Sequence, residues 1–195
     1  MSPTHKHVGA ILLAAGFSNR FGGAKLLAPL DSGTSVFAQT YARLSAAVED
    51  ILVVTRPELA DELRPLCEDL IVFEDAELGM GASLACGMGH VADWDACLIC
   101  LADMPFIQAD TYLALAAGSR ADGIVQPMFN DKPGNPVVFG SQFFPDLQAL
   151  SGDTGGKPVL QQHREGIIRL EVSDPAVLSD IDTPGDLNEL QSTFA

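Results

Sequence analysis

Short apolar runs alternate with helix-like segments over the first 118 residues of the chain. The runs, which we predict to be β-strands, cover residues 8–14, 51–55, 70–73 and 96–102. The helix-like segments lie at about 35–48, 58–67, 82–92 and 108–118. Because the first run is apolar on both faces, it is typical of a parallel strand buried beneath helices on each side. The alternation predicts an α/β fold with a parallel sheet and right-handed crossovers.

From Gly123 onward the regular alternation of predicted strands and helices ends, and the order of elements becomes mixed. Extended pieces are predicted around 123–128, 135–140 and 167–172, and helices at 143–150, 156–165 and from Pro184 to about Gln191. An exposed turn is expected from Asn130 to Gly134. Since no repeat, low-complexity tract or linker marks a boundary, we expect one domain over residues 1–195, with an N-terminal tail over 1–7.

The chain carries 26 acidic and 11 basic residues, a formal net charge of -15. This charge disfavours nucleic acid or an anionic membrane surface as a partner. A small anionic ligand is still compatible, provided that a few placed cations or a bound metal supply positive charge locally. The apolar runs are far shorter than the roughly 18 residues needed to span a membrane, and no signal-peptide pattern opens the chain, so we expect a cytoplasmic protein.

Cys97 and Cys100 form a Cys-x-x-Cys pattern that is found in zinc and redox sites. Here the pattern lies within a predicted strand, and residues three apart on a strand point to opposite faces of the sheet. Two such thiolates cannot share one metal, and no second pair follows. We expect both cysteines, together with Cys67 and Cys86, to be reduced residues of the core.

The segment from Leu13 to Lys25 directly follows the first predicted strand and is rich in glycine. Its glycines would let the backbone turn sharply and bring peptide N–H groups close to anionic oxygens, while its two cations supply charge. These residues are Gly16, Gly22, Gly23, Arg20 and Lys25. The pattern is typical of a phosphate-binding loop, and an ordinary surface loop with two solvated cations is the alternative.

The spacing excludes two better-known phosphate-binding motifs. A Walker A motif needs Gly-Lys-Ser/Thr, whereas Lys25 lies three residues beyond Gly22 and precedes Leu26. The nearest candidate for a dinucleotide fingerprint, residues 79–84, has Leu84 where the third glycine belongs, so NAD and FAD are not expected. This second segment opens a predicted helix, whose N-terminal amides can hold anionic groups, or else forms a plain turn.

Two aspartates are candidate metal ligands. Asp103 follows the 96–102 run, so its carboxylate is expected at the carboxyl edge of a central strand, where Mg²⁺ and a phosphate could be held together. Pro105 keeps Asp103 out of the next helix, which Asp110 could cap. Asp182 is either a second metal ligand or, like Thr183, a cap of the last helix.

The sequence contains no credible nucleophile and base. Neither a Gly-x-Ser-x-Gly elbow nor a His-Glu-x-x-His pair occurs, and His90 and His163 are isolated. Transfer to an ionised phosphate needs no proton removal, only positioning, charge neutralisation and a metal. The absence of a base is therefore consistent with chemistry on phosphates.

Four segments together closely resemble the molybdenum cofactor cytidylyltransferases, in the same order along the chain. They are residues 13–25, 102–105 (Ala-Asp-Met-Pro), 134–139 (Gly-Asn-Pro-Val-Val-Phe) and 180–184 (Asp-Ile-Asp-Thr-Pro). The resemblance implies a three-layer Rossmann-like nucleotidyltransferase fold with a mostly parallel central sheet and helices on both faces. It also implies transfer of CMP from CTP to a molybdopterin-type cofactor, with release of pyrophosphate and delivery of the product to a molybdenum hydroxylase.

The resemblance also implies roles for particular residues. Arg20, Lys25 and Asp103 would be catalytic, and Mg²⁺ would bind Asp103 with Asp182 as second ligand. The nucleotide-binding residues would be Leu13, Ala14, Ala15, Gly16, Arg20, Lys25, Gly81, Ser83 and Asp103. Asn135 and Gly155 would lie on the acceptor side.

Two positions bear on the substrates. Ala15 gives Leu-Ala-Ala-Gly, as in cytidylyl members of the family, whereas guanylyl enzymes usually have Leu-Ala-Gly-Gly. Asn135 departs from the Gly-His-Pro of many relatives, which weakens the assignment of the acceptor. The alternatives are a nucleotidyltransferase that uses another phosphorylated acceptor or GTP, and a non-catalytic chaperone that binds the molybdenum cofactor.

Overall fold

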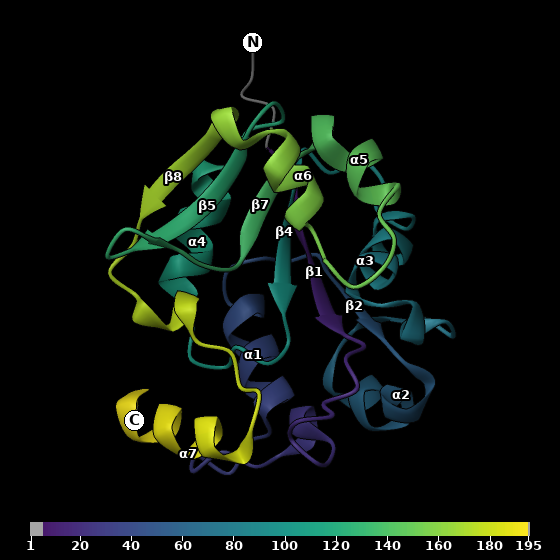
Figure 1. Ribbon diagram of the computed structural model, residues 1–195, viewed down its shortest axis with the longest axis vertical. Helices are drawn as coiled ribbons and strands as arrows, with labels where there is room; N and C mark the ends of the chain where they lie inside the picture. The colour runs from purple at the N-terminus through teal and green to yellow at the C-terminus, as the bar shows by residue number, and fades with distance from the viewer. Residues whose placement is uncertain (1–5, 195) are drawn as a thin grey trace.

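The computed structural model describes residues 6–194 and contains an eight-stranded mixed sheet at its centre (Figure 1). The strand order is β3-β2-β1-β4-β7-β5-β6, and β8 pairs with β5 on its other side. The strands are β1 (Val8–Ala14), β2 (Ile51–Thr55), β3 (Asp69–Val72), β4 (Ala96–Leu101), β5 (Ile124–Phe129), β6 (Lys132–Pro133), β7 (Val137–Gly140) and β8 (Ile167–Glu171).

The four strands predicted from the first half of the sequence pair with one another in parallel. β1 lies between β2 and β4 and is parallel to both, with Leu12 opposite Val53 and Cys100. β3 pairs in parallel with β2 at the edge. Because β1 is covered on both faces, Ile11 and Leu12 are both fully buried. The prediction of a parallel α/β sheet is confirmed for this half.

The strands from the second half of the sequence pair in both parallel and antiparallel directions. β7 pairs antiparallel with β4 and with β5, whereas β8 is parallel to β5. In the predicted exposed turn, Asn130 and Asp131 both have positive φ angles, and the short strand β6 pairs back onto β5. The turn is therefore the tip of a β-hairpin, since two central residues with positive φ suit the twist of antiparallel strands.

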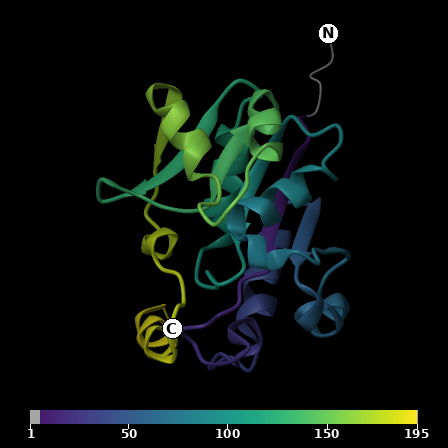
Figure 2. The ribbon, with the colours of Figure 1, turned by 45° about the vertical axis from the view of Figure 1, so that its right-hand side comes forward.

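Helices cover both faces of the sheet, which confirms the three-layer arrangement. One apolar core contains side chains of α1 (Val36–Ser45), α2 (Pro57–Leu63), α4 (Ala109–Gly118) and α7 (Pro184–Phe194). The other core contains side chains of α3 (Met80–Met88), α5 (Phe144–Gln148) and α6 (Lys157–Gln162). Figures 1 and 2 show β1 and β4 pointing toward the end of the molecule where α7 lies.

The start of α4 is held by a residue that sequence reasoning did not find. Asp110 was the expected cap, but it lies in the first turn of the helix, and the N-cap position is Gln108. The backbone N–H of Gln108 donates to Asp174 Oδ2 at 2.8 Å, and the Thr111 hydroxyl donates to the same oxygen at 2.8 Å. A buried carboxylate from a distant segment thus supplies the acceptor that a local cap would provide.

Cys97 and Cys100 point into opposite cores, as expected for residues three apart on a strand. Burial raises the pKa of both thiols. All four cysteines are free; Cys67 is half-buried and packs against one core, whereas Cys86 is half-buried and belongs to neither core, so the expectation of a core cysteine is wrong for Cys86. Of the tail predicted over residues 1–7, residues 1–5 lie outside the described part of the chain.

Within residues 6–194, no helix has the length and apolar character to cross a membrane.

Candidate functional site

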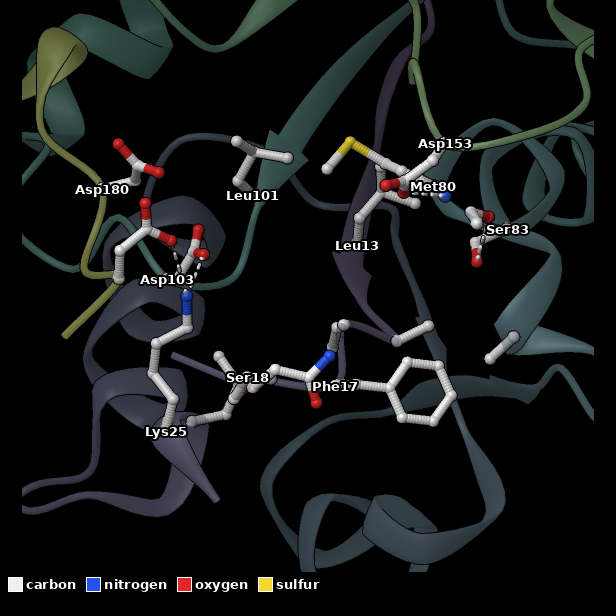
Figure 3. Close-up of a pocket in the computed structure, with 18 of the residues that line it drawn as sticks. Leu13, Phe17, Ser18, Lys25, Met80, Ser83, Leu101, Asp103, Asp153 and Asp180 are labelled. Atoms are coloured by element: carbon white, nitrogen blue, oxygen red, sulfur yellow. Dashed lines mark hydrogen bonds and ion pairs between the residues drawn. The ribbon is translucent and has the colours of Figure 1, made fainter. Parts of the chain in front are cut away.

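A cavity of about 710 Å³ lies beyond the carboxyl ends of β1 and β4 (Figure 3). This is the edge at which open α/β sheets bind ligands. Its lining residues are Leu13, Ala14, Ala15, Gly16, Phe17, Ser18, Asn19, Arg20, Lys25, Leu26, Ala76, Glu77, Gly79, Met80, Ser83, Leu101, Asp103, Asp153, Asp180 and Asp182. The fold thus brings most of the predicted site residues into one cavity.

The loop after β1 forms the floor of the cavity and carries both predicted cations. It turns at Ser18, whose carbonyl accepts the backbone N–H groups of Phe21 and Gly22, and ends in the 3-10 turn Lys25–Leu27. Gly22 has a φ of 76°, a conformation that favours glycine. Gly16 has no such φ, and no heavy atom of the described residues would lie within 4 Å of a Cβ there. Open space beside the Gly16 backbone is what close approach of a ligand requires.

The two cations of this loop contact two carboxylates from distant strands and loops. Lys25 Nζ lies 2.7 Å from Asp103 Oδ2 and 3.7 Å from Asp182 Oδ1. Arg20 Nη1 lies 2.8 Å from Asp182 Oδ2. The Lys25 side chain is only 9% exposed, whereas that of Arg20 is 73% exposed. Lys25 is therefore a buried charge within the cavity wall, and Arg20 is an exposed charge at its rim.

Asp103 has one unused oxygen. Its Oδ1 is buried and has no hydrogen-bond partner among the described residues, while Oδ2 accepts from Lys25. Burial raises the pKa of this carboxyl above its usual range, Lys25 acts in the opposite direction, and nearby Asp180 adds to the increase. A buried carboxylate oxygen without a partner costs free energy unless a ligand satisfies it. This orphan oxygen fits a divalent cation, which carboxylate oxygens coordinate.

Asp182 is free to take part in this cluster because other residues cap α7. The backbone N–H of Asp186 donates to Thr183 Oγ1 at 3.2 Å, and that of Thr183 donates to Asp186 Oδ2 at 2.7 Å. Thr183 is thus the cap of the last helix, one of the two alternatives left by the sequence. The carboxylate of Asp182 points instead to Arg20 and Lys25.

The described residues hold no preformed cage of three or more His, Cys, Asp or Glu side chains. Asp103 and Asp182 therefore fit an ion that takes its other ligands from water and from a phosphate substrate, as Mg²⁺ usually does. Figure 3 shows Asp103, Asp180 and Lys25 on one side of Leu13, and Met80, Ser83 and Asp153 on the other.

The start of α3 differs from the prediction at Gly81. Its backbone N–H donates to the carbonyl of Gly152 at 2.7 Å, and Gly81 does not line the cavity. This amide hydrogen is already used, so the expectation that Gly81 contacts the nucleotide is not supported. Ser83 does line the cavity, and its hydroxyl donates to the carbonyl of Gly79 at 3.1 Å.

The two acceptor-side residues lie outside the cavity lining. The backbone N–H of Asn135 donates to Val177 O, and Asn135 precedes Pro136 through a cis peptide bond. A Cβ at Gly155 would lie 2.8 Å from Met80 Sδ. The lining also contains residues for which the sequence predicted no role. One of them is Phe17, whose position within the predicted phosphate-binding segment was the signal that could have identified it.

The two cations of the cavity lie together at one side of it. Arg20 and Lys25 lie beside the carboxylates at one side, where they can bind the oxygens of a polyphosphate. The rest of the wall combines apolar and small residues of the β1 end and of α3 with the carboxylates of Glu77 and Asp153 and the Ser83 hydroxyl, which donates to Gly79 O. The site can therefore bind and orient a phosphorylated ligand with a planar or apolar portion.

Comparisons with known proteins agree with this geometry. A model of the MobA-like NTP transferase domain matches residues 10–167. The purine catabolism protein PucB of Bacillus subtilis is 32% identical over 198 residues, which cover 95% of this chain and 96% of PucB. The molybdenum cofactor cytidylyltransferase of Escherichia coli is 25% identical over 187 residues, which cover 92% of this chain and 93% of that enzyme.

Solved structures show the same relationship. The crystal structure of Rv0371c from Mycobacterium tuberculosis superposes on this chain with a TM-score of 0.85. The two sequences are 27% identical, and the match covers 96% of this chain and 98% of Rv0371c. A complex of Rv0371c with manganese superposes with a TM-score of 0.81 at 25% identity, over 96% of this chain and 100% of that one. The family match covers most of the chain and includes the loop after β1 and strand β4, whereas Asp180 and Asp182 of the cavity lining lie beyond it. The chain therefore belongs to the MobA-like NTP transferase family and is a nucleotidyltransferase.

Proposed function

We propose that this enzyme transfers CMP from CTP to a molybdopterin-type cofactor in a Mg²⁺-dependent reaction in the cytoplasm. The products are the cytosine dinucleotide form of the cofactor, which a molybdenum hydroxylase would receive, and pyrophosphate. The observation that carries the proposal is the buried, unpartnered Oδ1 of Asp103 beside Lys25, at the edge of a cavity whose loop matches the Leu-Ala-Ala-Gly pattern.

The residues of the chain would act by binding and orientation. Backbone groups of residues 13–16 would hold the nucleoside, with Gly16 giving the closest approach. Lys25 and Arg20 would bind the triphosphate and offset the charge that gathers on the leaving pyrophosphate. A phosphate oxygen of the acceptor would attack the α-phosphorus of CTP in line, forming one P–O bond as the bond to pyrophosphate breaks.

Asp103 and Asp182 would hold the divalent cation, and the orphan oxygen of Asp103 supports this assignment. When bound, Mg²⁺ neutralises phosphate charge and acts as a Lewis acid. Lys25 bridges the two carboxylates, so it would hold them in place in the metal-free protein. The manganese complex of Rv0371c is a precedent for a divalent cation in a protein of this fold.

The test is release of pyrophosphate by the purified protein. We expect release with CTP, Mg²⁺ and molybdopterin-type cofactor together, and little release when any one of them is omitted. GTP, ATP and UTP are compared with CTP at the same concentration. Turnover with GTP and none with CTP would refute the choice of base, although the transferase chemistry would stand.

Two observations favour a second class of acceptor. PucB, named for purine catabolism, is more similar to this chain than the cytidylyltransferase of Escherichia coli is, at 32% against 25% identity. Asn135 also departs from the usual family pattern. Sugar and alcohol phosphates are therefore screened with labelled CTP, and label transfer to one of them, but not to molybdopterin-type cofactor, would replace the proposed acceptor.

A further inference from the structure

Two segments far apart in the sequence interlock at the first turn of α3. Residues 79–81 contact residues 151–155, and we call this pair of segments the clasp. The backbone N–H of Met80 donates to Asp153 Oδ1 at 3.2 Å, and that of Gly81 donates to Gly152 O at 2.7 Å. The second segment therefore satisfies two amides that an α-helix leaves without partners inside the helix.

The backbones within the clasp approach so closely that side chains do not fit between them. A Cβ at Gly79 would lie 2.7 Å from the backbone of Gly152 and Asp153, and one at Gly81 would lie 2.8 Å from the carbonyl oxygen of Ser151. Real Cβ atoms almost never come this close to backbone atoms. The two segments are therefore packed backbone against backbone, and the only charged side chain that joins them by a hydrogen bond among the described residues is Asp153.

The clasp forms one wall of the cavity. Gly79, Met80 and Asp153 all line it, and Ser83 follows one turn later on the same helix. Figure 3 shows Asp153 and Met80 side by side, across Leu13 from the group of Asp103 and Lys25. The cavity thus has its cationic contacts on one side and the clasp on the other.

We propose that Asp153 is a positioning residue for the nucleotide, because it fixes the first turn of α3 as the cavity wall opposite Lys25. This inference rests on the proposed function in that the ligand is a nucleoside triphosphate. Asp153 itself need not touch the reacting phosphates, since its Oδ1 acts through the backbone of Met80. Loss of this hydrogen bond loosens the first turn of α3, which the bond from Gly81 N–H to Gly152 O still joins to the second segment, and weakens nucleotide binding more than it slows the chemical step.

The test compares Asp153→Ala with Asp153→Asn. Alanine removes the acceptor, whereas the amide oxygen of asparagine can accept from Met80 in the same place. Ser35→Ala is a matched control, because Ser35 Oγ accepts from Ala38 at the start of α1 and Ser35 does not line the cavity. Dissociation constants are measured by calorimetry without acceptor. The titrant is whichever of CTP, GTP, ATP and UTP the wild-type protein binds most tightly, so that an error in the choice of base leaves the comparison intact.

We expect Asp153→Ala to raise the dissociation constant and KM for the nucleotide about fivefold, the effect of losing one helix-capping contact, with kcat changed far less. Asp153→Asn should bind nearly as tightly as the wild type, and Ser35→Ala should lower thermal stability without weakening binding. Unchanged affinity in Asp153→Ala would overturn the proposal. Equal loss of affinity in the alanine and asparagine variants would also overturn it, since the hydrogen bond to Met80 would then not be the cause.

Discussion

Lys25 Nζ lies 2.7 Å from Asp103 Oδ2, although the two residues are 78 positions apart in the chain. The contact joins the loop after β1 to the end of β4, two neighbouring strands of the parallel sheet. It leaves the second oxygen of Asp103 buried without a partner among the described residues. Since buried polar atoms are normally hydrogen-bonded, this oxygen is the one that a bound ligand would satisfy.

Asp103→Asn should abolish most of the transferase activity. The amide keeps the size of the side chain but removes the charge that would hold a divalent cation, so we expect kcat to fall at least about 100-fold. The protein should remain folded, because asparagine can still accept from Lys25. Pyrophosphate release and thermal unfolding measure the two effects separately.

Asp122→Asn is the control for this substitution. Asp122 is exposed and pairs with Arg120 away from the cavity. The activity of the Asp122→Asn variant should therefore equal that of the wild type. A chaperone without catalytic function would show molybdenum-cofactor binding and no pyrophosphate release in the wild type. Retention of full activity in Asp103→Asn would contradict the metal assignment.

Replacement of Lys25 by Met should raise the pKa of Asp103 further. Burial already raises this pKa, and Lys25 is the charge that acts against the increase. A folded-state pKa above the ordinary value of 3.8 means that this group favours folding below that pH, and that the contribution is lost as the pH rises through the folded-state pKa. Carbon-13 NMR titration of the metal-free protein measures the pKa directly.

Arg20→Met is the comparison for the Lys25 variant. Arg20 pairs with Asp182 and makes no ion pair with Asp103, so its removal should move the Asp103 pKa less than removal of Lys25 does. If the two variants shift the pKa equally, the close contact of Lys25 with Asp103 is not the main electrostatic influence on this carboxyl.

Sequence patterns located the elements well where the signal is local. The apolar runs ending at Ala14 and near Leu101 marked β1 and β4, and the residues just after them marked the edge of the sheet where the cavity lies. The alternation of faces also assigned Cys97 and Cys100 correctly to opposite cores. These features depend on periodicity and on chain order, both of which are visible in a single sequence.

Features that depend on contacts between distant segments were not predictable in this way. Asp174 rather than Asp110 holds the start of α4, and Gly152 uses the amide of Gly81 that was expected to face a ligand. No local pattern records which carbonyl or carboxylate a distant loop will supply. The antiparallel placement of β7 between β4 and β5 belongs to the same class, since strand pairing is decided by the whole sheet.

Gly16→Ala tests whether the glycine at this position is needed for ligand binding or for folding. The Gly16 backbone needs no left-handed conformation and has open space where a Cβ would lie, so the unfolding temperature should hardly change. The added methyl group would occupy the space through which a ligand approaches the backbone. We expect the dissociation constant for CTP to rise about tenfold, equivalent to the loss of one good contact.

Gly22→Ala, in contrast to Gly16→Ala, should lower the stability of the folded protein. A Cβ at Gly22 also meets open space, but the φ of +76° strains any L side chain, and the substitution should cost about 1 kcal/mol of unfolding free energy. Chemical denaturation measures this cost for both variants. A larger loss of stability in Gly16→Ala than in Gly22→Ala would show that the backbone of Gly16 is constrained for folding rather than for binding.

Ala15→Gly should shift base selectivity from CTP toward GTP. Ala15 is buried and lines the cavity directly after β1, so removal of its methyl group enlarges the space available to a base without exposing a polar atom. One methyl group in a pocket changes discrimination by about tenfold, and we expect the ratio of kcat/KM for GTP over CTP to rise by that factor. Ala24→Gly removes a methyl group from the same loop outside this cavity and should leave the ratio unchanged. Competition between labelled CTP and GTP in one reaction measures the ratio; an equal fall for both nucleotides would mean that Ala15 supports the loop and does not select the base.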